Sequence, residues 1–140
     1  MGCIVAAMSG VANPLVTADR FDTPASHEAM QAIGSGLGAA GFIVFDDATD
    51  FAEVAYGVSR FLAVESCGQC TPCREGTGWM WRVLERMAKG QAEKREIDML
   101  LNVSYQVEGH TICALGDAAA CQERVAHAIS PASGIGFVRH

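Results

Sequence analysis

The first part of the chain alternates short apolar runs with turn-forming residues. Residues 4–8 predict one strand, and residues 25–33 predict one short helix. The compact apolar run at residues 42–47 ends in two aspartates and predicts a buried strand. Between the first strand and the short helix, residues 9–24 are rich in Asp, Pro and Asn, which favour turns over long regular structure. We therefore expect residues 1–48 to form a glycine-rich mixed segment.

From residue 50 onward, apolar residues recur with the period of an α-helix. Phe51, Val54 and Val58 begin one apolar face, and Asp50 stands where an N-cap belongs. Gly90 and Gly109 are expected to close the second and third helices. Four helices with short links fit an antiparallel bundle, so the predicted fold class is α+β, mostly α, with a four-helix bundle over residues 49–140. The predicted helices run from Asp50 to the cysteine-rich stretch, and over residues 72–89, 94–107 and 112–129.

Composition narrows the classes of function. The chain has 140 residues, of which 50% are hydrophobic, so its composition is that of a globular protein. Its net charge of −6 argues against nucleic acid as a partner, because binding the phosphate backbone needs clustered Lys and Arg. No apolar run reaches the roughly 20 residues that a membrane span needs. The N-terminus lacks the basic residues of a secretory signal, so we expect a reducing compartment, where clustered cysteines favour metal or redox chemistry over structural disulfides.

A glycine pattern precedes the second predicted strand. Gly36, Gly38 and Gly41 match the G-x-G-x-x-G spacing of dinucleotide-binding sites. That fingerprint needs a strand before the glycines and a helix after them, whereas here the predicted order is helix, glycines, strand. We therefore interpret the glycines as a turn where elements pack closely.

Three cysteines lie within seven residues of one another in the stretch "ESCGQCTPCREG". Cys67, Cys70 and Cys73 form a C-x2-C-x2-C run, which bacterial ferredoxins use to hold three irons of a [4Fe–4S] cube. A four-cysteine zinc site usually presents two separate C-x2-C pairs, and a redox dithiol needs only two cysteines. Three buried thiols without metal are the remaining alternative. The pattern favours an iron–sulfur cluster.

The residues around this run suit an anionic cluster. Thr71 is expected to cap the second helix, with Pro72 at its first position, so that Cys73 lies in the first helical turn. The positive end of the helix dipole then faces the site. Gly68 leaves room for the loop to curl closely, and Arg74 adds a positive charge.

A [4Fe–4S] cube needs a fourth ligand from elsewhere. Cys113 is expected at the start of the fourth helix, from which it can reach across one end of a bundle, and it is the favoured candidate. Cys121, eight residues later, is interpreted as a small core residue. His110 is interpreted as a turn residue beside the site, although histidine replaces cysteine in some clusters. Cys3 has no partner at metal-binding spacing and is expected to be buried.

The two cysteine stretches together resemble a known family. "ESCGQCTPCREG" followed by "EGHTICALGD" is similar to the flavoprotein, NADH-binding subunit of respiratory complex I, and to the related diaphorase subunits of NAD-linked hydrogenases and formate dehydrogenases. The segments "PLVTADRFDTP" and "AIGSGLGAAGFIVFDD" also look like the part of that family before the cysteines. The resemblance covers roughly residues 10 to 120. The sequence diverges from the family's pattern after Asp117, and similar proteins carry an aromatic residue where Cys121 stands.

The resemblance implies a ligand set and a place in electron transfer. Cys67, Cys70, Cys73 and Cys113 would hold one [4Fe–4S] cluster, which in this family takes electrons from FMN that NADH has reduced. Residues 1–24 look like the tail of the family's small β-grasp domain, and the family's flavin and nucleotide segment does not occur in this sequence. FMN and NADH are therefore expected only through a partner or a missing domain. Such partners would be the parts of an NADH-oxidising complex that supply the flavin site and the next iron–sulfur centre.

Three functions follow from these observations. The first is an electron-transfer module that is not catalytic alone and belongs to a complex related to NADH:quinone oxidoreductase or to another NAD-linked oxidoreductase. Its expected location is cytoplasmic, or peripheral on the cytoplasmic or matrix side of a membrane complex. The second is a truncated remnant, or a metal-free structural or interaction chain without redox activity. The third, an enzyme with its own NADH site, is disfavoured by the missing nucleotide segment.

Overall fold

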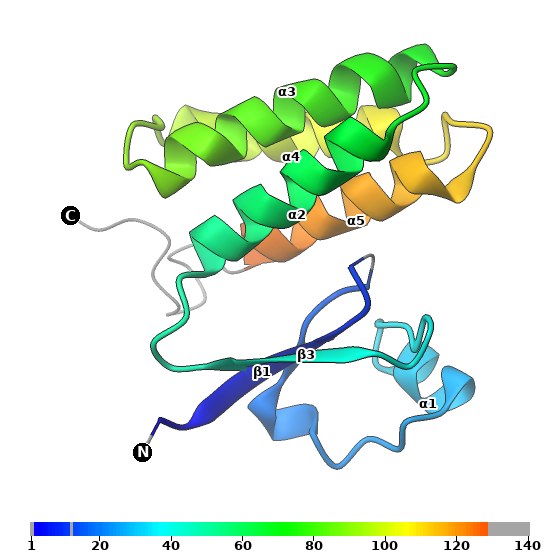
Figure 1. Cartoon of the computed structure of the whole chain (residues 1–140), viewed down its shortest axis with the longest axis vertical. Helices are drawn as coiled ribbons and strands as arrows, with labels where there is room; N and C mark the ends of the chain where they lie inside the picture. Colours follow the sequence, from blue (N-terminus) through cyan, green and yellow to red (C-terminus); the bar gives the residue numbers. More distant parts are fainter. Residues whose placement is uncertain (1, 12, 129–140) are drawn as a thin grey trace. The chain divides into compact units, whose positions relative to one another are not determined.

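The computed structural model describes residues 2–11 and 13–128, with side chains in that range up to residue 121. The chain divides into two compact units, Met1–Thr49 and Asp50–His140, which we describe separately (Figure 1). Within the described residues, no helix has both the length and the apolar character needed to cross a bilayer.

The first unit is built on a small antiparallel sheet. Its three described strands lie in the order β2–β1–β3, with Ala6 of β1 opposite Phe45 of β3. Helix α1 follows β2, and the Ser26 hydroxyl caps it by accepting a hydrogen bond from the Ala29 amide at 3.2 Å. The elements are β1 (Ile4–Ser9), β2 (Val16–Thr17), a 3-10 turn (Ala18–Arg20), α1 (His27–Ala32) and β3 (Phe42–Asp46). Strand β1, helix α1 and strand β3 are thus found where the sequence pattern predicts them.

The expectation that β3 is a buried strand is wrong. Phe42, Ile43 and Val44 are 45–55% exposed, and only Phe45 is buried. Among the described strands, β3 pairs with β1 alone and is therefore an edge strand. A continuous apolar run identifies a strand but does not say how many of its faces are covered.

The glycine stretch packs against the loop after β1. The Asn13 side chain donates a hydrogen bond to the Ser9 carbonyl at 2.6 Å and lies where a Cβ at Gly36 or Gly38 would have to go. The Ser9 hydroxyl donates to the Leu37 carbonyl. Gly38 has a φ of +53°, which favours glycine. The prediction of a turn with close packing is confirmed.

The second unit consists of helices packed around a shared core. Contacts join α2 with α3, α3 with α4, α4 with α5, and α5 with α2. Figure 1 shows successive helices running in opposite directions, so the α2–α3 and α4–α5 loops lie at the same end. The helices are α2 (Phe51–Glu65), α3 (Thr71–Ala88), α4 (Arg95–Val107) and α5 (Ala114–Ala128). Their buried side chains include Ala55, Leu62, Met80, Val83, Leu84, Leu100, Val107, Ala119 and Ala120.

The predicted helix ends are confirmed with two exceptions. The fourth helix begins at Ala114, two residues after the predicted start at residue 112, so Cys113 directly precedes it. The Asp50 carboxylate accepts from the Ala52 amide at 2.9 Å, as an N-cap does, and Gly90 and Gly109 follow α3 and α4 with positive φ. The other exception is α3, whose N-cap is Cys70 and not Thr71. The Cys70 carbonyl already accepts the first helical bond, from the Arg74 amide at 2.9 Å. The predicted end of the fourth helix at residue 129 lies outside the described residues.

Candidate metal centre

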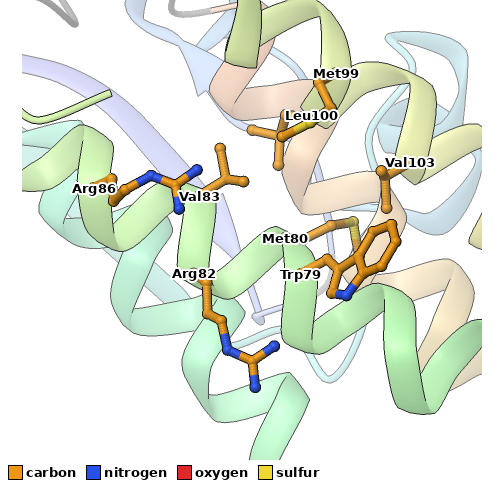
Figure 2. A pocket seen from close by; sticks show the side chains of 8 residues that line it. All are labelled: Trp79, Met80, Arg82, Val83, Arg86, Met99, Leu100 and Val103. Atoms are coloured by element: carbon orange, nitrogen blue, oxygen red, sulfur yellow. The ribbon is translucent and has the colours of Figure 1, made fainter. Parts of the chain in front are cut away.

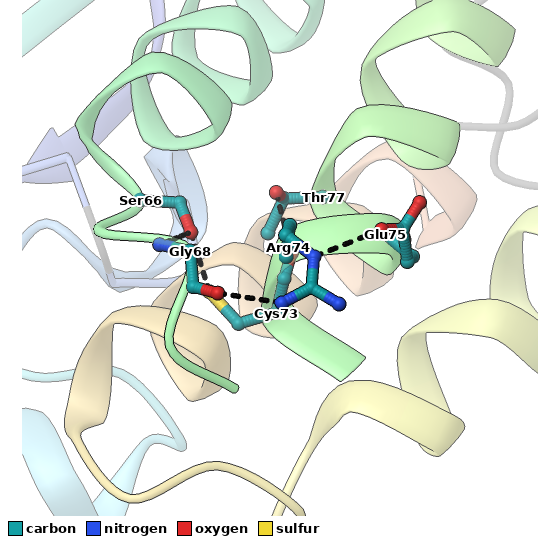
Figure 3. A network of polar contacts seen from close by, with 6 residues as sticks. All are labelled: Ser66, Gly68, Cys73, Arg74, Glu75 and Thr77. Atoms are coloured by element: carbon teal, nitrogen blue, oxygen red, sulfur yellow. Dashed lines mark hydrogen bonds and ion pairs between the residues drawn. The ribbon is translucent and has the colours of Figure 1, made fainter. Parts of the chain in front are cut away.

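The α2–α3 loop is held in a tight turn around its glycine. Gly68 has a φ of +76°, a conformation in which a residue with a Cβ is strained. The Arg74 guanidinium donates to the Gly68 carbonyl at 2.7 Å and also pairs with Glu75 at 3.0 Å (Figure 3). The predicted positive charge is therefore present beside the loop, and it also fixes the backbone between Cys67 and Cys70.

The three clustered cysteines differ in their burial. Cys73 is 6% exposed, Cys70 is half-buried and Cys67 is exposed. The Ser66 hydroxyl lies 3.2 Å from the Cys73 sulfur and accepts from the Gly68 amide at 3.3 Å (Figure 3). The Cys73 carbonyl accepts a hydrogen bond from the buried Thr77 hydroxyl at 2.7 Å. Cys73 is thus fixed on the first turn of α3, while Cys67 faces solvent.

The start of α3 provides a favourable electrostatic environment for an anion. Cys70 is the N-cap, and Cys73 lies in the first turn, where backbone amides have no helical acceptor. Pro72, at the second helical position, has no amide to satisfy. The positive end of the helix dipole therefore lies next to two of the sulfurs. Thiolates are better tolerated here than along the side of a helix.

The α4–α5 loop is tied to the first turn of α5. The Gly109 amide, at a φ of +72°, donates to the Asp117 carboxylate at 2.7 Å. The Thr111 hydroxyl donates to the Cys113 carbonyl at 2.9 Å, and its side chain lies where a Cβ at Gly116 would go. The sequence "EGHTICALGD" thus forms a short loop that is stabilised by hydrogen bonds within itself and to the first turn of α5, and the loop ends at Cys113.

One contact brings the two cysteine loops together. The Ile112 amide donates to the Cys70 sulfur at 3.4 Å, joining residues 42 positions apart. Cys113 is the next residue after Ile112. Cys121 lies eight residues further along α5, which corresponds to a rise of about 12 Å. Proximity therefore favours Cys113 over Cys121 as the companion of the C-x2-C-x2-C loop.

The other residues considered from the sequence, His110, Cys121 and Cys3, are exposed or half-buried. His110 is exposed, with its ring nitrogen 2.8 Å from the Glu108 carbonyl in its own loop. Cys121 is half-buried. Cys3 is exposed, so the expectation that it is buried is wrong. It lies just before β1, in a stretch where the neighbouring residues Gly2 and Ile4 are also exposed.

The helical unit also has a groove along α3 and α4. It has a volume of about 270 Å³, and Figure 2 shows Trp79 and Met99 on its walls with Arg82 and Arg86 among the lining side chains. The Arg86 guanidinium is ion-paired with Glu96 of α4. No cysteine lines this groove.

The residues present fit an iron–sulfur cluster in kind and place. Cys67 and Cys70 lie in the α2–α3 loop, Cys73 lies in the first turn of α3, and Cys113 ends the α4–α5 loop, which contacts Cys70 through the Ile112 amide. The N-terminus of α3 and the Arg74 guanidinium lie close by. Within the described residues, no three Cys, His, Asp or Glu side chains converge as they would around a bound metal. The loops are adjacent, but the thiols do not surround a common point.

A family comparison identifies the helical unit. Residues 53–127 match the family described as the NADH-ubiquinone oxidoreductase-F iron-sulfur binding region. The chain belongs to this family. Its defining property is a [4Fe–4S] cluster, so the resemblance on which the sequence interpretation relied is confirmed.

Curated relatives of this iron–sulfur family share high identity over the matched region. The NADH-quinone oxidoreductase F subunit of Rhizobium meliloti (strain 1021) is 61% identical over 99 residues, which are 71% of this chain and 23% of the relative. The corresponding protein of Rickettsia akari (strain Hartford) is 54% identical over 111 residues, 79% of this chain and 26% of the relative. The chain thus spans about a quarter of the length of these relatives.

The fold is also found in a solved structure. A chain of an NAD+-reducing [NiFe]-hydrogenase in the air-oxidised state superposes with a TM-score of 0.82 at 25% identity. The superposition covers 99% of this chain and 24% of that chain. The H2-reduced state of that hydrogenase gives the same values.

Sequence reasoning missed three residues that shape the site. Ser66, Ile112 and Asp117 hold or brace the cysteine loops. Ser66 and Asp117 act through side-chain contacts that have no spacing rule, and Ile112 acts through its backbone amide. The sequence carried no signal for any of them.

Proposed function

We propose that this chain is an electron-transfer module that holds one [4Fe–4S] cluster through Cys67, Cys70, Cys73 and Cys113. The cluster would supply one-electron transfer. In this proposal, α2–α5 form a four-helix bundle whose cysteine end binds the cluster. Residues 1–48 form a separate segment that includes the end of a β-grasp domain.

The observation that carries the proposal is the hydrogen bond from the Ile112 amide to the Cys70 sulfur. It supports Cys113 as the fourth ligand, because the adjacent residue is already next to the C-x2-C-x2-C loop. The amide is a donor that stabilises negative charge on a ligand sulfur. Closing of the two loops would bring the thiols to one point, in keeping with metal binding that completes its own site.

The wider role rests on the relatives. Because they are subunits of NADH-quinone oxidoreductase and about three times as long, we propose that the FMN and NADH sites belong to a partner or to a segment outside this sequence. The chain would then be peripheral on the cytoplasmic or matrix side of such a complex and would pass electrons to a further iron–sulfur centre. It would not be catalytic alone.

Metal analysis tests the ligand set directly. Protein purified without oxygen should contain about four iron and four acid-labile sulfide per chain and show the absorption of a [4Fe–4S] cluster. Cys73→Ser and Cys113→Ser should lose the cluster, whereas Cys3→Ser and Cys121→Ser should retain it. A wild-type chain without iron would favour the metal-free structural role. Loss of iron in Cys121→Ser but not in Cys113→Ser would show that the fourth ligand is misassigned.

A further inference from the structure

Ser66 is placed to donate a hydrogen bond to the most buried ligand sulfur. Its backbone ends α2 in an extended conformation, and its hydroxyl lies 3.2 Å from the Cys73 sulfur. Either atom can donate when Cys73 is a thiol. A metal-bound thiolate has no proton, so only the hydroxyl can then be the donor.

The direction of this hydrogen bond is reinforced by a second one. The Gly68 amide donates to the Ser66 oxygen at 3.3 Å and occupies one of its lone pairs. The hydroxyl proton is thereby left for the sulfur, and a chain of two hydrogen bonds polarises in one direction. The Arg74 guanidinium, which donates to the Gly68 carbonyl at 2.7 Å, fixes the turn that supplies this amide.

We propose that Ser66 sets the reduction potential of the cluster by donating this hydrogen bond, so that the potential is higher than it would be without the hydroxyl. The inference rests on the proposed function, because it needs Cys73 as a ligand. One-electron reduction adds a unit of negative charge, part of which lies on the ligand sulfurs. A donor aimed at a sulfur therefore stabilises the reduced state more than the oxidised state. One electron enters, and no proton moves.

Burial makes this position more effective than the others. Cys73 is 6% exposed, whereas Cys67 and Cys113 are exposed, so water can solvate charge on those two sulfurs but hardly on the Cys73 sulfur. Electrostatic interactions are stronger where water is excluded. The Ile112 amide makes a comparable bond to Cys70, but among substitutions only proline removes a backbone donor, and proline also restricts the backbone of the loop. Ser66 is thus a position where a side-chain substitution alone can change the potential.

A redox titration of the full chain tests this role. Wild type, Ser66→Ala and Ser66→Thr are purified without oxygen, and each potential is measured by mediated titration followed by electron paramagnetic resonance. Ser104→Ala is the matched control, because the Ser104 hydroxyl bonds the Leu101 carbonyl of its own helix. We expect equal iron in all four chains and a lower potential in Ser66→Ala alone. The expected loss is about threefold to tenfold in the equilibrium constant for reduction, tenfold being 59 mV for one electron.

The outcomes separate this inference from the proposed function. A wild-type chain without iron overturns the proposed function and this inference with it. Iron in every chain with equal potentials in wild type and Ser66→Ala overturns this inference alone. It is also overturned if Ser66→Ala loses its iron while Ser66→Thr keeps it, because the hydroxyl would then be needed to assemble the site.

Discussion

Two glycines in the same helix should respond to alanine in opposite directions. Gly76 and Gly78 both lie in α3, and each is expected to cost helix stability relative to alanine. Gly76 is buried where α3 meets α4, and a Cβ there would overlap the Val107 side chain. At Gly78 the nearest atom to a new Cβ is the end of the flexible Arg82 side chain, at 3.7 Å.

The magnitudes follow from two competing effects. Alanine in place of a helical glycine contributes about 1 kcal/mol through helix propensity. Forcing an extra carbon into a packed contact costs about 1–3 kcal/mol, and Val107, at 1% exposure, has little room to move aside. Gly76→Ala should therefore lower the free energy of unfolding by about 1 kcal/mol, whereas Gly78→Ala should raise it by up to about 1 kcal/mol.

Urea unfolding of metal-free, reduced protein measures this difference. The two variants should differ by about 2 kcal/mol, or about 1 M in the urea midpoint for a denaturant slope of about 2 kcal/mol/M. Iron content provides a second measurement. Gly76 lies about one turn after Cys73, so pushing α4 away should separate the cysteine loops and reduce the iron in Gly76→Ala only. If Gly76→Ala were as stable as Gly78→Ala and kept its iron, the close approach of α3 and α4 would be refuted.

Three further predictions concern ligand binding and the loops. Calorimetric titration of the chain with NADH should show no binding, because Gly36 and Gly38 are packed against Asn13; micromolar affinity would contradict this. Hydrogen exchange should be faster in cluster-free than in cluster-loaded protein at residues 65–78 and 109–118, and equal protection would show that the fold is independent of the cluster. Asp117→Ala should lower the free energy of unfolding by about 1 kcal/mol, because the Gly109 amide loses its acceptor, and Asp117→Asn should be closer to wild type. Equal stability of all three chains would show that this hydrogen bond does not stabilise the α4–α5 loop.

The helices were predictable because their signals are local. The recurrence of apolar residues placed α3 and α4 within one residue at either end, and the cap at Asp50 and the closing glycines at 90 and 109 need only neighbouring residues to act. Phe42–Asp46 was also recognisable as a strand, since a short apolar run bounded by turn residues has few alternatives.

Contacts between distant residues were not predictable. The approach of Ile112 to Cys70 depends on how the helices pack, and no local pattern encodes it. Gly76 is a similar case, because its local cost to the helix gives no sign of the Val107 side chain that a Cβ at this position would overlap. The burial of β3 and of Cys3 was misjudged for the same reason, since burial depends on what covers a residue. The ligand set itself remains a prediction.

Because the two cysteine loops lie at one end of the helical unit, the opposite end is available for attaching a probe or a surface. The link between α3 and α4, at residues 89–94, is separated from the cysteines by the whole of α3, whose 18 residues span about 27 Å. A fluorophore, a surface tether or an inserted peptide at this link would lie far from the cysteines of the two loops. It would therefore not interfere with iron binding there. The protein could therefore be immobilised by residues 89–94 with its cysteine end presented to an electrode or to an electron donor.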